Sequence, residues 1–436
     1  MCFPLQAVVV PLGFSGEEPV KRVGRSIAAL CVLAVASAGF VYYQRSYSSP
    51  YATPVVESLA DGDPGSFEGL LSLAESLPPS ATLKVLWTHG MCTHPPGWID
   101  DRMRRLVEAV GGTSETLSVR PVGKHGASLR TDRISTRDRT IEVVFLTWSP
   151  LTASYKAALA YDAQSIKGGG VRATLNRDLK GGLVNDCLTD VVVYSGPNGA
   201  NLRQAMNETV CGALGGRFDG NECDVPAGGS PAALALITES LGSKLVFDAV
   251  LHIWNAAIDS KDKTAIRRLA NSFAATKVMY MLANQVPLLD AAGSVALDRI
   301  LEPQPESAPA KIRTSAGDVF NLLSRARRLV LPQAGPMTVV AFSDPNDLLS
   351  YRIVPQHLAE DFKEFRVINV LVSNDATYFG YLERPDTAHC GYPWNPHVFG
   401  MLAKGYQAGK PLPSVSGLLD GACLSFASLR RAEAQK

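Results

Sequence analysis

One serine in the sequence has the local setting of a catalytic nucleophile. The apolar run 233–237 predicts a buried strand, Ser240 follows at a tight turn, and a helix is expected to begin near Ser243. Thr238 and Gly242 lie two residues before and two residues after the serine, where a strained strand-to-helix turn needs small side chains. Such a turn exposes the hydroxyl and directs a helix N-terminus at developing negative charge. The pattern predicts acyl chemistry at Ser240, with an ordinary helix-capping serine as the alternative.

This strand–serine–helix segment resembles the nucleophile turn of the α/β-hydrolase superfamily. The first small residue of that motif is usually glycine, and Thr238 departs from it as in some lipases of this fold. The resemblance covers about residues 81–410 and rests on this segment and the three described next. It implies an α/β fold of the α/β-hydrolase type, with a doubly wound parallel sheet, helices on both faces and an inserted cap or lid.

A second segment, 85–92, runs from a predicted strand directly into the pair His89-Gly90. In α/β-hydrolases the loop after an early strand supplies one backbone N–H of the oxyanion hole. The resemblance therefore implies the N–H groups of Met91 and Leu241 as the two donors. Acyl transfer builds an oxyanion, and two prealigned amides stabilise it by several kcal/mol. His89 itself is expected to brace the loop.

A metal site is the alternative use of this segment, with His89, Cys92 and His94 as ligands. Their spacing is irregular and a fourth ligand is not evident. The chain also has no Cys-x-x-Cys pair, which argues against a zinc ribbon or a thioredoxin-type redox site. No metal and no cofactor are expected.

The acid is expected after a late strand, 338–342. Asp347 fits the Asn-Asp-aliphatic-aliphatic pattern that is common at this position in the superfamily. Asp344 is the alternative acid, although its place before Pro345 suits a turn in which it accepts backbone N–H groups. Asp290, after the preceding predicted strand, is a third candidate.

The base is expected on a loop after the last predicted strand, 367–372, because catalytic groups gather at the carboxyl ends of parallel strands. His389 lies between a small residue and Cys390-Gly391, ahead of a helix that begins near Pro396. His397 falls in the first turn of that helix and is the second choice. The chain order Ser240, Asp347, His389 is the order of the α/β-hydrolase triad.

Short apolar runs alternate with amphipathic stretches from residue 81 onward, which predicts a parallel sheet covered by helices. The gap between the second and third strands is too long for a plain crossover and predicts an insertion around 149–230. The predicted strands are 84–87, 141–146, 233–237, 278–282, 338–342 and 367–372. The predicted helices are 98–110, 153–165, 202–214, 243–258, 316–329 and 398–405.

The N-terminal region indicates export. Residues 27–43 are uncharged and mostly apolar, and basic residues precede them, so residues 1–26 are expected in the cytoplasm and the rest outside. The apolar run is either a transmembrane anchor or the core of a signal peptide with a cleavage site at 36–38. Residues 44–80 are expected to form a linker, and residues 81–436 the α/β-hydrolase domain.

Six cysteines follow the apolar run, an even number that fits disulfides in an oxidising compartment. Cys211 and Cys223 flank a glycine-rich loop and are expected to pair. Cys423 and Cys92 are the two candidate partners of Cys390, and the sequence does not choose between them.

The net charge is +1, so no overall electrostatic bias draws the chain to nucleic acid. The leading hypothesis is a serine hydrolase that cleaves a small-molecule or lipid ester, with a periplasmic location and membrane attachment through the N-terminal segment. The alternatives are a non-catalytic binding or scaffold protein on the same fold, and an acyltransferase of the cell envelope.

Overall fold

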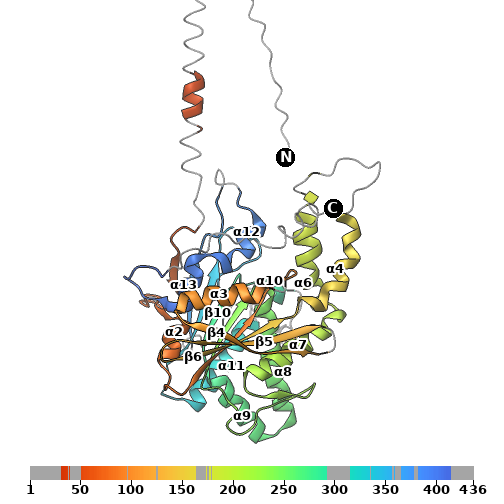
Figure 1. The fold of residues 1–436 in the computed structure, drawn as a ribbon, viewed down its shortest axis with the longest axis vertical. Helices are drawn as coiled ribbons and strands as arrows, with labels where there is room; N and C mark the ends of the chain where they lie inside the picture. The colour runs from red at the N-terminus through yellow and green to blue at the C-terminus, as the bar shows by residue number, and fades with distance from the viewer. Residues whose placement is uncertain are drawn as a thin grey trace, which may run out of the picture. The chain divides into compact units, whose positions relative to one another are not determined.

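A nine-stranded mixed sheet organises the chain in the computed structural model (Figure 1). The structure describes residues 31–37, 39, 51–95, 97–123, 126–163, 173, 176–177, 179–291, 315–333, 335–355, 358, 365–377 and 382–413. The strand order is β1-β12-β11-β10-β9-β3-β6-β5-β4. The strands are β1 (Val55–Ser58), β3 (Thr82–Thr88), β4 (Thr113–Val122), β5 (Ala127–Ser135), β6 (Thr140–Thr147), β9 (Ala233–Glu239), β10 (Thr276–Leu282), β11 (Met337–Ser343) and β12 (Phe365–Leu371).

The centre of the sheet is parallel and both of its margins are antiparallel. Strands β6, β3, β9, β10, β11 and β12 run parallel, while β1 is antiparallel to β12 and β5 is antiparallel to both β6 and β4. The α/β class and all six predicted strands are therefore confirmed, but the sheet is mixed rather than wholly parallel. Within the predicted linker 44–80 the structure places β1, β2 (Phe67–Glu68) and α2 (Leu70–Glu75).

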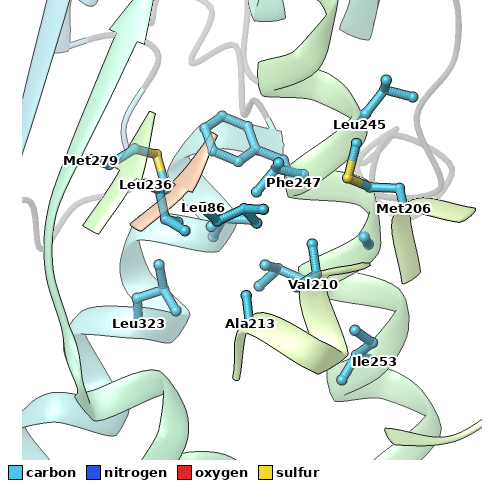
Figure 2. Close-up of a cluster of buried hydrophobic side chains, with 14 of the residues drawn as sticks. Leu86, Met206, Val210, Ala213, Leu236, Leu245, Phe247, Ile253, Met279 and Leu323 are labelled. Atoms are coloured by element: carbon cyan, nitrogen blue, oxygen red, sulfur yellow. The ribbon is translucent and has the colours of Figure 1, made fainter. Parts of the chain in front are cut away.

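Helices cover both faces of the sheet because the buried strands alternate their side chains between two hydrophobic clusters. In β9, Leu234 and Leu236 belong to one cluster, while Ala235 and Ile237 belong to the other. In the first cluster, Leu236 of the sheet packs with residues of the helices, such as Phe247 (Figure 2). The helices of that face are α7 (Ala200–Ala213), α8 (Leu241–Ser260), α9 (Lys263–Ala274) and α11 (Ser315–Val330), and α2, α3 (Trp98–Val110) and α13 (Pro396–Lys404) cover the opposite face.

The region between β6 and β9 carries the predicted insertion. Its helices α4 (Ala153–Leu159) and α6 (Thr189–Ser195) lie side by side (Figure 1). The other elements there are η1 (Ser149–Thr152), η2 (Ala160–Ala163), the π-helical η3 (Leu179–Leu188), η4 (Pro197–Gly199), β7 (Arg217–Phe218) and β8 (Cys223–Asp224). The short elements that complete the fold are α10 (Val286–Asp290), α12 (Pro385–Cys390), η8 (Tyr392–Trp394) and β13 (Gly405–Tyr406).

Two disulfides involve this region: Cys92–Cys187 joins it to the segment after β3, and Cys211–Cys223 lies within it. The predicted pairing of Cys211 with Cys223 is confirmed. Pairing of Cys92 with Cys390 is wrong because Cys92 is bonded to Cys187 instead; Cys390 is itself disulfide-bonded, and Cys423 lies outside the described residues. Disulfides of this kind indicate a protein that folds in an oxidising, exported environment.

The chain divides into two units, residues 1–48 with 376–382 and residues 49–375 with 383–436. Most of the predicted anchor or signal core, 27–43, lies outside the described residues, which include a helical stretch at 31–37. Among the described residues, no helix combines the length and the apolar character that a membrane span requires. The sheet and the site described below belong to the second unit.

Candidate active site

The candidate site lies at the carboxyl ends of the central parallel strands. Strand β3 pairs with β6 on one side and with β9 on the other, so the connections after β3 and β9 leave the sheet next to each other. In open α/β sheets such a switch in strand order forms a crevice where ligands bind. The segment after β3 holds His89 and Met91, and Ser240 directly follows β9.

Ser240 has a strained backbone. Its φ of 53° lies in the left-handed region, and its N–H donates a hydrogen bond to the carbonyl of Leu282 at 2.7 Å. A residue other than glycine keeps such a conformation only where its surroundings impose it, which is typical of functional sites. Helix α8 begins at Leu241, immediately after the serine and two residues earlier than predicted.

The loop after β3 packs closely against this turn only because Gly90 and Gly242 have no side chain. A β-carbon on Gly90 would lie 2.7 Å from Cβ of Ser240, and one on Gly242 would lie 2.7 Å from the carbonyl oxygen of His89. The loop after β3 therefore touches the serine turn. Met91 N–H follows this contact in the chain, and Leu241 N–H is in the first turn of α8, where helix amides have no intrahelical partner.

Ser240, His389 and Asp347 form one hydrogen-bonded chain. Ser240 Oγ is 2.9 Å from His389 Nε2, and His389 Nδ1 is 2.9 Å from both carboxyl oxygens of Asp347. Because a carboxylate only accepts, Nδ1 carries the proton and Nε2 presents a lone pair to the serine hydroxyl. This is the protonation pattern that a histidine needs in order to take a proton from serine.

His389 lies in the short helix α12, not in a loop as predicted. The helix begins at Pro385 and has Asp386 in its first turn, and both residue types favour a helix start. His397 lies in the first turn of α13, where its backbone N–H donates to Asn395 Oδ1. No contact between His397 and the serine is found among the described residues.

Further donors hold Asp347 in place. The N–H of Leu349 donates to Oδ1 at 3.0 Å, and the Tyr392 hydroxyl donates to Oδ2 at 3.0 Å. Burial, together with the Asp347 charge, raises the pKa of Tyr392 well above its usual range, so its hydroxyl keeps its proton and stays a donor. The backbone N–H of Asp344 in turn donates to this hydroxyl at 2.7 Å.

The two other candidate acids have structural partners. Asp344 accepts the N–H groups of Asn346 at 2.9 Å and Asn374 at 2.7 Å, the turn role considered for it. Asp290 accepts two hydrogen bonds from Ser315 and lies 3.2 Å from Lys244 Nζ. Of the three aspartates, Asp347 is the one that the described contacts join to His389.

A pair of buried acids lies next to the triad. Burial raises the pKa of Glu383 to about 8, and the neighbouring charge of Asp344 acts in the same direction. The pKa of Asp344 is likewise raised, chiefly by burial. Glu383 accepts hydrogen bonds from Asn346 Nδ2 and from the N–H of Asp375, so it links the segment that precedes Asp347 to the segment that follows β12.

Glu383→Gln is expected to change how stability depends on pH. The folded protein holds a proton on Glu383 between about pH 4.5 and pH 8 that the unfolded chain releases, so wild-type stability falls as pH rises through this window. The Glu383→Gln variant has no titrating group at this position, so its stability does not fall in this way as pH rises. Its melting temperature should match wild type near pH 5 and exceed it by roughly a few degrees near pH 9, measured by thermal unfolding. The exposed control Glu108→Gln should show no such trend, and a pH-independent difference for Glu383→Gln would contradict the assignment.

His89 is a structural residue. Its Nε2 accepts the N–H of Trp148 at 3.1 Å, which places the proton on Nδ1, and Nδ1 then donates to the carbonyl of Gly90 at 2.7 Å. Burial lowers the pKa of His89 well below its usual range, and burial lowers that of the stacked His94 to about 4. Both rings are therefore neutral, and His89 braces the loop as predicted. Cys92, a ligand of the alternative metal site, forms a disulfide with Cys187, so it has no free thiolate to bind a metal.

Residues of the insertion hold the loop after β3 at Cys92 and Thr93. Cys92 has a φ of 83°, is bonded to Cys187, and donates its N–H to Asp190 Oδ2 at 2.7 Å. Lys156 Nζ is 3.0 Å from the same carboxyl oxygen. Burial raises the pKa of Asp190 to about 6, partly offset by the charge of Lys156. The Thr93 N–H also donates to Asp186, so three residues of the insertion fix the segment that follows Met91.

A cavity of about 280 Å³ opens beside Ser240 and His389. Apolar and aromatic side chains form much of its wall, among them Met91, Trp98, Leu282, Tyr392, Pro393 and Trp394. The charged side chains in the wall pair with each other, since Arg102 Nε lies 3.4 Å from Glu239 Oε1. Arg102 also stacks on Trp394, with Cζ 4.6 Å from the ring centroid. The site therefore suits a small, largely uncharged ligand.

No family model, curated protein or solved structure matches this chain. Sequence reasoning missed Tyr392, Asp190 and Gln285, each of which touches a candidate catalytic group or its loop. None of them lies in a local motif, and their roles depend on contacts between distant segments.

Proposed function

We propose that the protein is a serine hydrolase of the α/β-hydrolase type that cleaves carboxylic esters through Ser240, His389 and Asp347. The observation that carries the proposal is the continuous chain of hydrogen bonds from Ser240 Oγ through both ring nitrogens of His389 to Asp347. The strained backbone of Ser240 on a strand-to-helix turn supports it. The proposed oxyanion donors are the N–H groups of Met91 and Leu241.

In the proposed reaction, Ser240 Oγ attacks the ester carbonyl carbon while His389 Nε2 takes its proton. The carbonyl oxygen becomes an oxyanion, which the two amides stabilise. The bond to the leaving oxygen then breaks as Nε2 returns the proton to it, leaving an acyl-enzyme. A water molecule repeats the sequence, releasing the acid and restoring Ser240. Asp347 keeps the proton on Nδ1 throughout and stabilises the imidazolium.

The substrate class follows from the cavity and from the insertion. A cavity of about 280 Å³ with an apolar wall fits an ester with a short acyl chain better than a long one. We propose that the insertion 149–230 acts as a cap, since Cys187, Asp186 and Asp190 hold the loop that borders the cavity. We further propose a location outside the cytoplasm, supported by the disulfides, with segment 27–43 as the anchor or signal.

Acyl transfer to an alcohol of the cell envelope would use the same three residues, and the non-catalytic scaffold would need none of them. A contact of 2.9 Å between Ser240 and His389 favours catalysis over a scaffold, for which no such alignment is required. Product analysis with and without an added alcohol separates transfer from hydrolysis.

A fluorophosphonate probe tests the proposal directly. We expect the probe to label the wild-type chain at Ser240, because only an activated serine attacks phosphorus at an appreciable rate. Ser240→Ala should abolish the label, as measured by mass spectrometry of the labelled peptide. Ser260→Ala, at the other end of α8, is the matched control and should retain the label. An unlabelled wild-type chain, or equal labelling of Ser240→Ala, would refute the proposed function.

A further inference from the structure

The segment after β10 presents a buried polar side chain that the reaction above does not use. Gln285 is 1% exposed, and its Oε1 has no hydrogen-bond partner among the residues that the structure describes. Its Nε2 lies 3.3 Å from His389 Nε2 and 3.9 Å from Met91 Sδ. A buried amide oxygen without a partner destabilises the folded protein, so a structural role alone does not account for this side chain.

The backbone around Gln285 is held rigidly. Ala283 has a φ of 55°, a strained left-handed conformation, and its N–H donates to the carbonyl of Phe342 at 3.1 Å. Asn284 Nδ2 donates to the carbonyl of Tyr351 at 2.9 Å, and the N–H of Tyr351 donates back to the carbonyl of Asn284 at 2.8 Å. These contacts join the segment to β11 and to the loop that follows it. The backbone that carries Gln285 is therefore fixed at the two residues before it.

We propose that Gln285 binds the oxygen atom of the departing alcohol, and the oxygen of the water that replaces it. This inference rests on the proposed function and adds a leaving-group site to it. The departing oxygen must lie within hydrogen-bond reach of His389 Nε2, which protonates it. The amide nitrogen of Gln285 is only 3.3 Å from that ring nitrogen. An oxygen at about 2.9 Å from both nitrogens closes this triangle with ordinary hydrogen-bond lengths.

This contact is expected to speed the cleavage of esters with poor leaving groups more than that of esters with good ones. As the bond between the acyl carbon and the departing oxygen breaks, negative charge grows on that oxygen until the proton from Nε2 arrives. An N–H of Gln285 donates to the oxygen during this step and stabilises the charge. A poor leaving group such as an alkoxide needs this help, whereas a p-nitrophenolate departs without it. Gln285 thus fits the enzyme to esters of ordinary aliphatic alcohols.

The test compares two esters of one acid, ethyl butyrate and p-nitrophenyl butyrate, in wild type and in Gln285→Met, which keeps the volume and removes the amide. We expect kcat/KM for the ethyl ester to fall by roughly 10- to 100-fold and that for the p-nitrophenyl ester by less than about threefold. Gln285→Asn, whose amide is one carbon too short to reach, should show the same pattern. The control Asn321→Leu removes another amide with a partnerless buried oxygen, on α11, and should change neither rate.

Fluorophosphonate labelling of Ser240 in each variant shows that the nucleophile and the fold are intact, since fluoride departs without a proton. An equal fall for both esters, or no fall for the ethyl ester, overturns the inference while leaving the proposed function standing. A wild-type chain without Ser240-dependent cleavage of either ester overturns the proposed function itself. The outcomes therefore separate the two claims.

Discussion

Replacement of His389 by alanine is expected to slow ester hydrolysis by about 10³- to 10⁶-fold, and Ser240→Ala by a similar factor. A serine hydroxyl near its free pKa is a poor nucleophile at neutral pH, and His389 Nε2 at 2.9 Å is the base that the described contacts give it. Because the residues act as one unit, the double variant should lose little more than either single one. Steady-state kinetics on purified variants with p-nitrophenyl butyrate measure all three rates.

Two matched variants make this test specific. His397→Ala removes the second histidine of the region, which has no described contact with Ser240, and should keep near wild-type activity. Asp347→Asn should reduce kcat by about 10⁴-fold because an amide favours the wrong tautomer of His389. Asp344→Asn alters the neighbouring carboxyl, which binds backbone N–H groups, and is expected to affect stability more than rate. Near wild-type activity in His389→Ala, with loss in His397→Ala, would transfer the base assignment to His397.

The sheet centre could be predicted from the sequence because parallel strands buried on both faces are continuous apolar runs. β4 and β5 could not be found in this way. β4 lacks a continuous apolar run, and nine of its ten residues are exposed, while the buried face of β5 includes the charged residue Asp132. Both strands form an antiparallel ribbon whose pairing depends on β6 rather than on their own composition.

The candidate site also contains residues that the sequence could place and residues that it could not. Ser240 could be placed because strand, turn and helix follow one another in the sequence, and His389 and Asp347 because late strands end at the same edge as β9. Asp190 meets Cys92 across 98 residues and Gln285 meets His389 across 104, and no local pattern marks either residue. Such contacts follow from how the insertion and the loops pack, which a single sequence does not reveal.

The second large expected effect concerns the disulfide that holds the loop after β3. Removing the Cys92–Cys187 disulfide with the double variant Cys92→Ala/Cys187→Ala should lower kcat by roughly 10²-fold with a smaller change in KM. Met91, whose N–H is the proposed oxyanion donor, directly precedes Cys92, and Cys92 is held in a strained backbone conformation by this bond and by Asp190. Without the bond, the segment can relax and the N–H leaves its alignment. Transition-state stabilisation suffers, while the cavity wall largely remains.

The second disulfide supplies the control for this prediction. Cys211→Ala/Cys223→Ala removes the same chemical bond from a site that does not line the cavity, so it should lower thermal stability but leave kcat near wild type. Each variant is compared at a temperature at which circular dichroism shows it folded, so that lost stability is not counted as lost rate. If both double variants lose the same activity, the Cys92–Cys187 bond stabilises the fold in general and has no specific effect on the Met91 N–H. If only the Cys92 variant loses kcat, the insertion aligns the oxyanion hole, because that bond is the covalent link between the insertion and the segment after Met91.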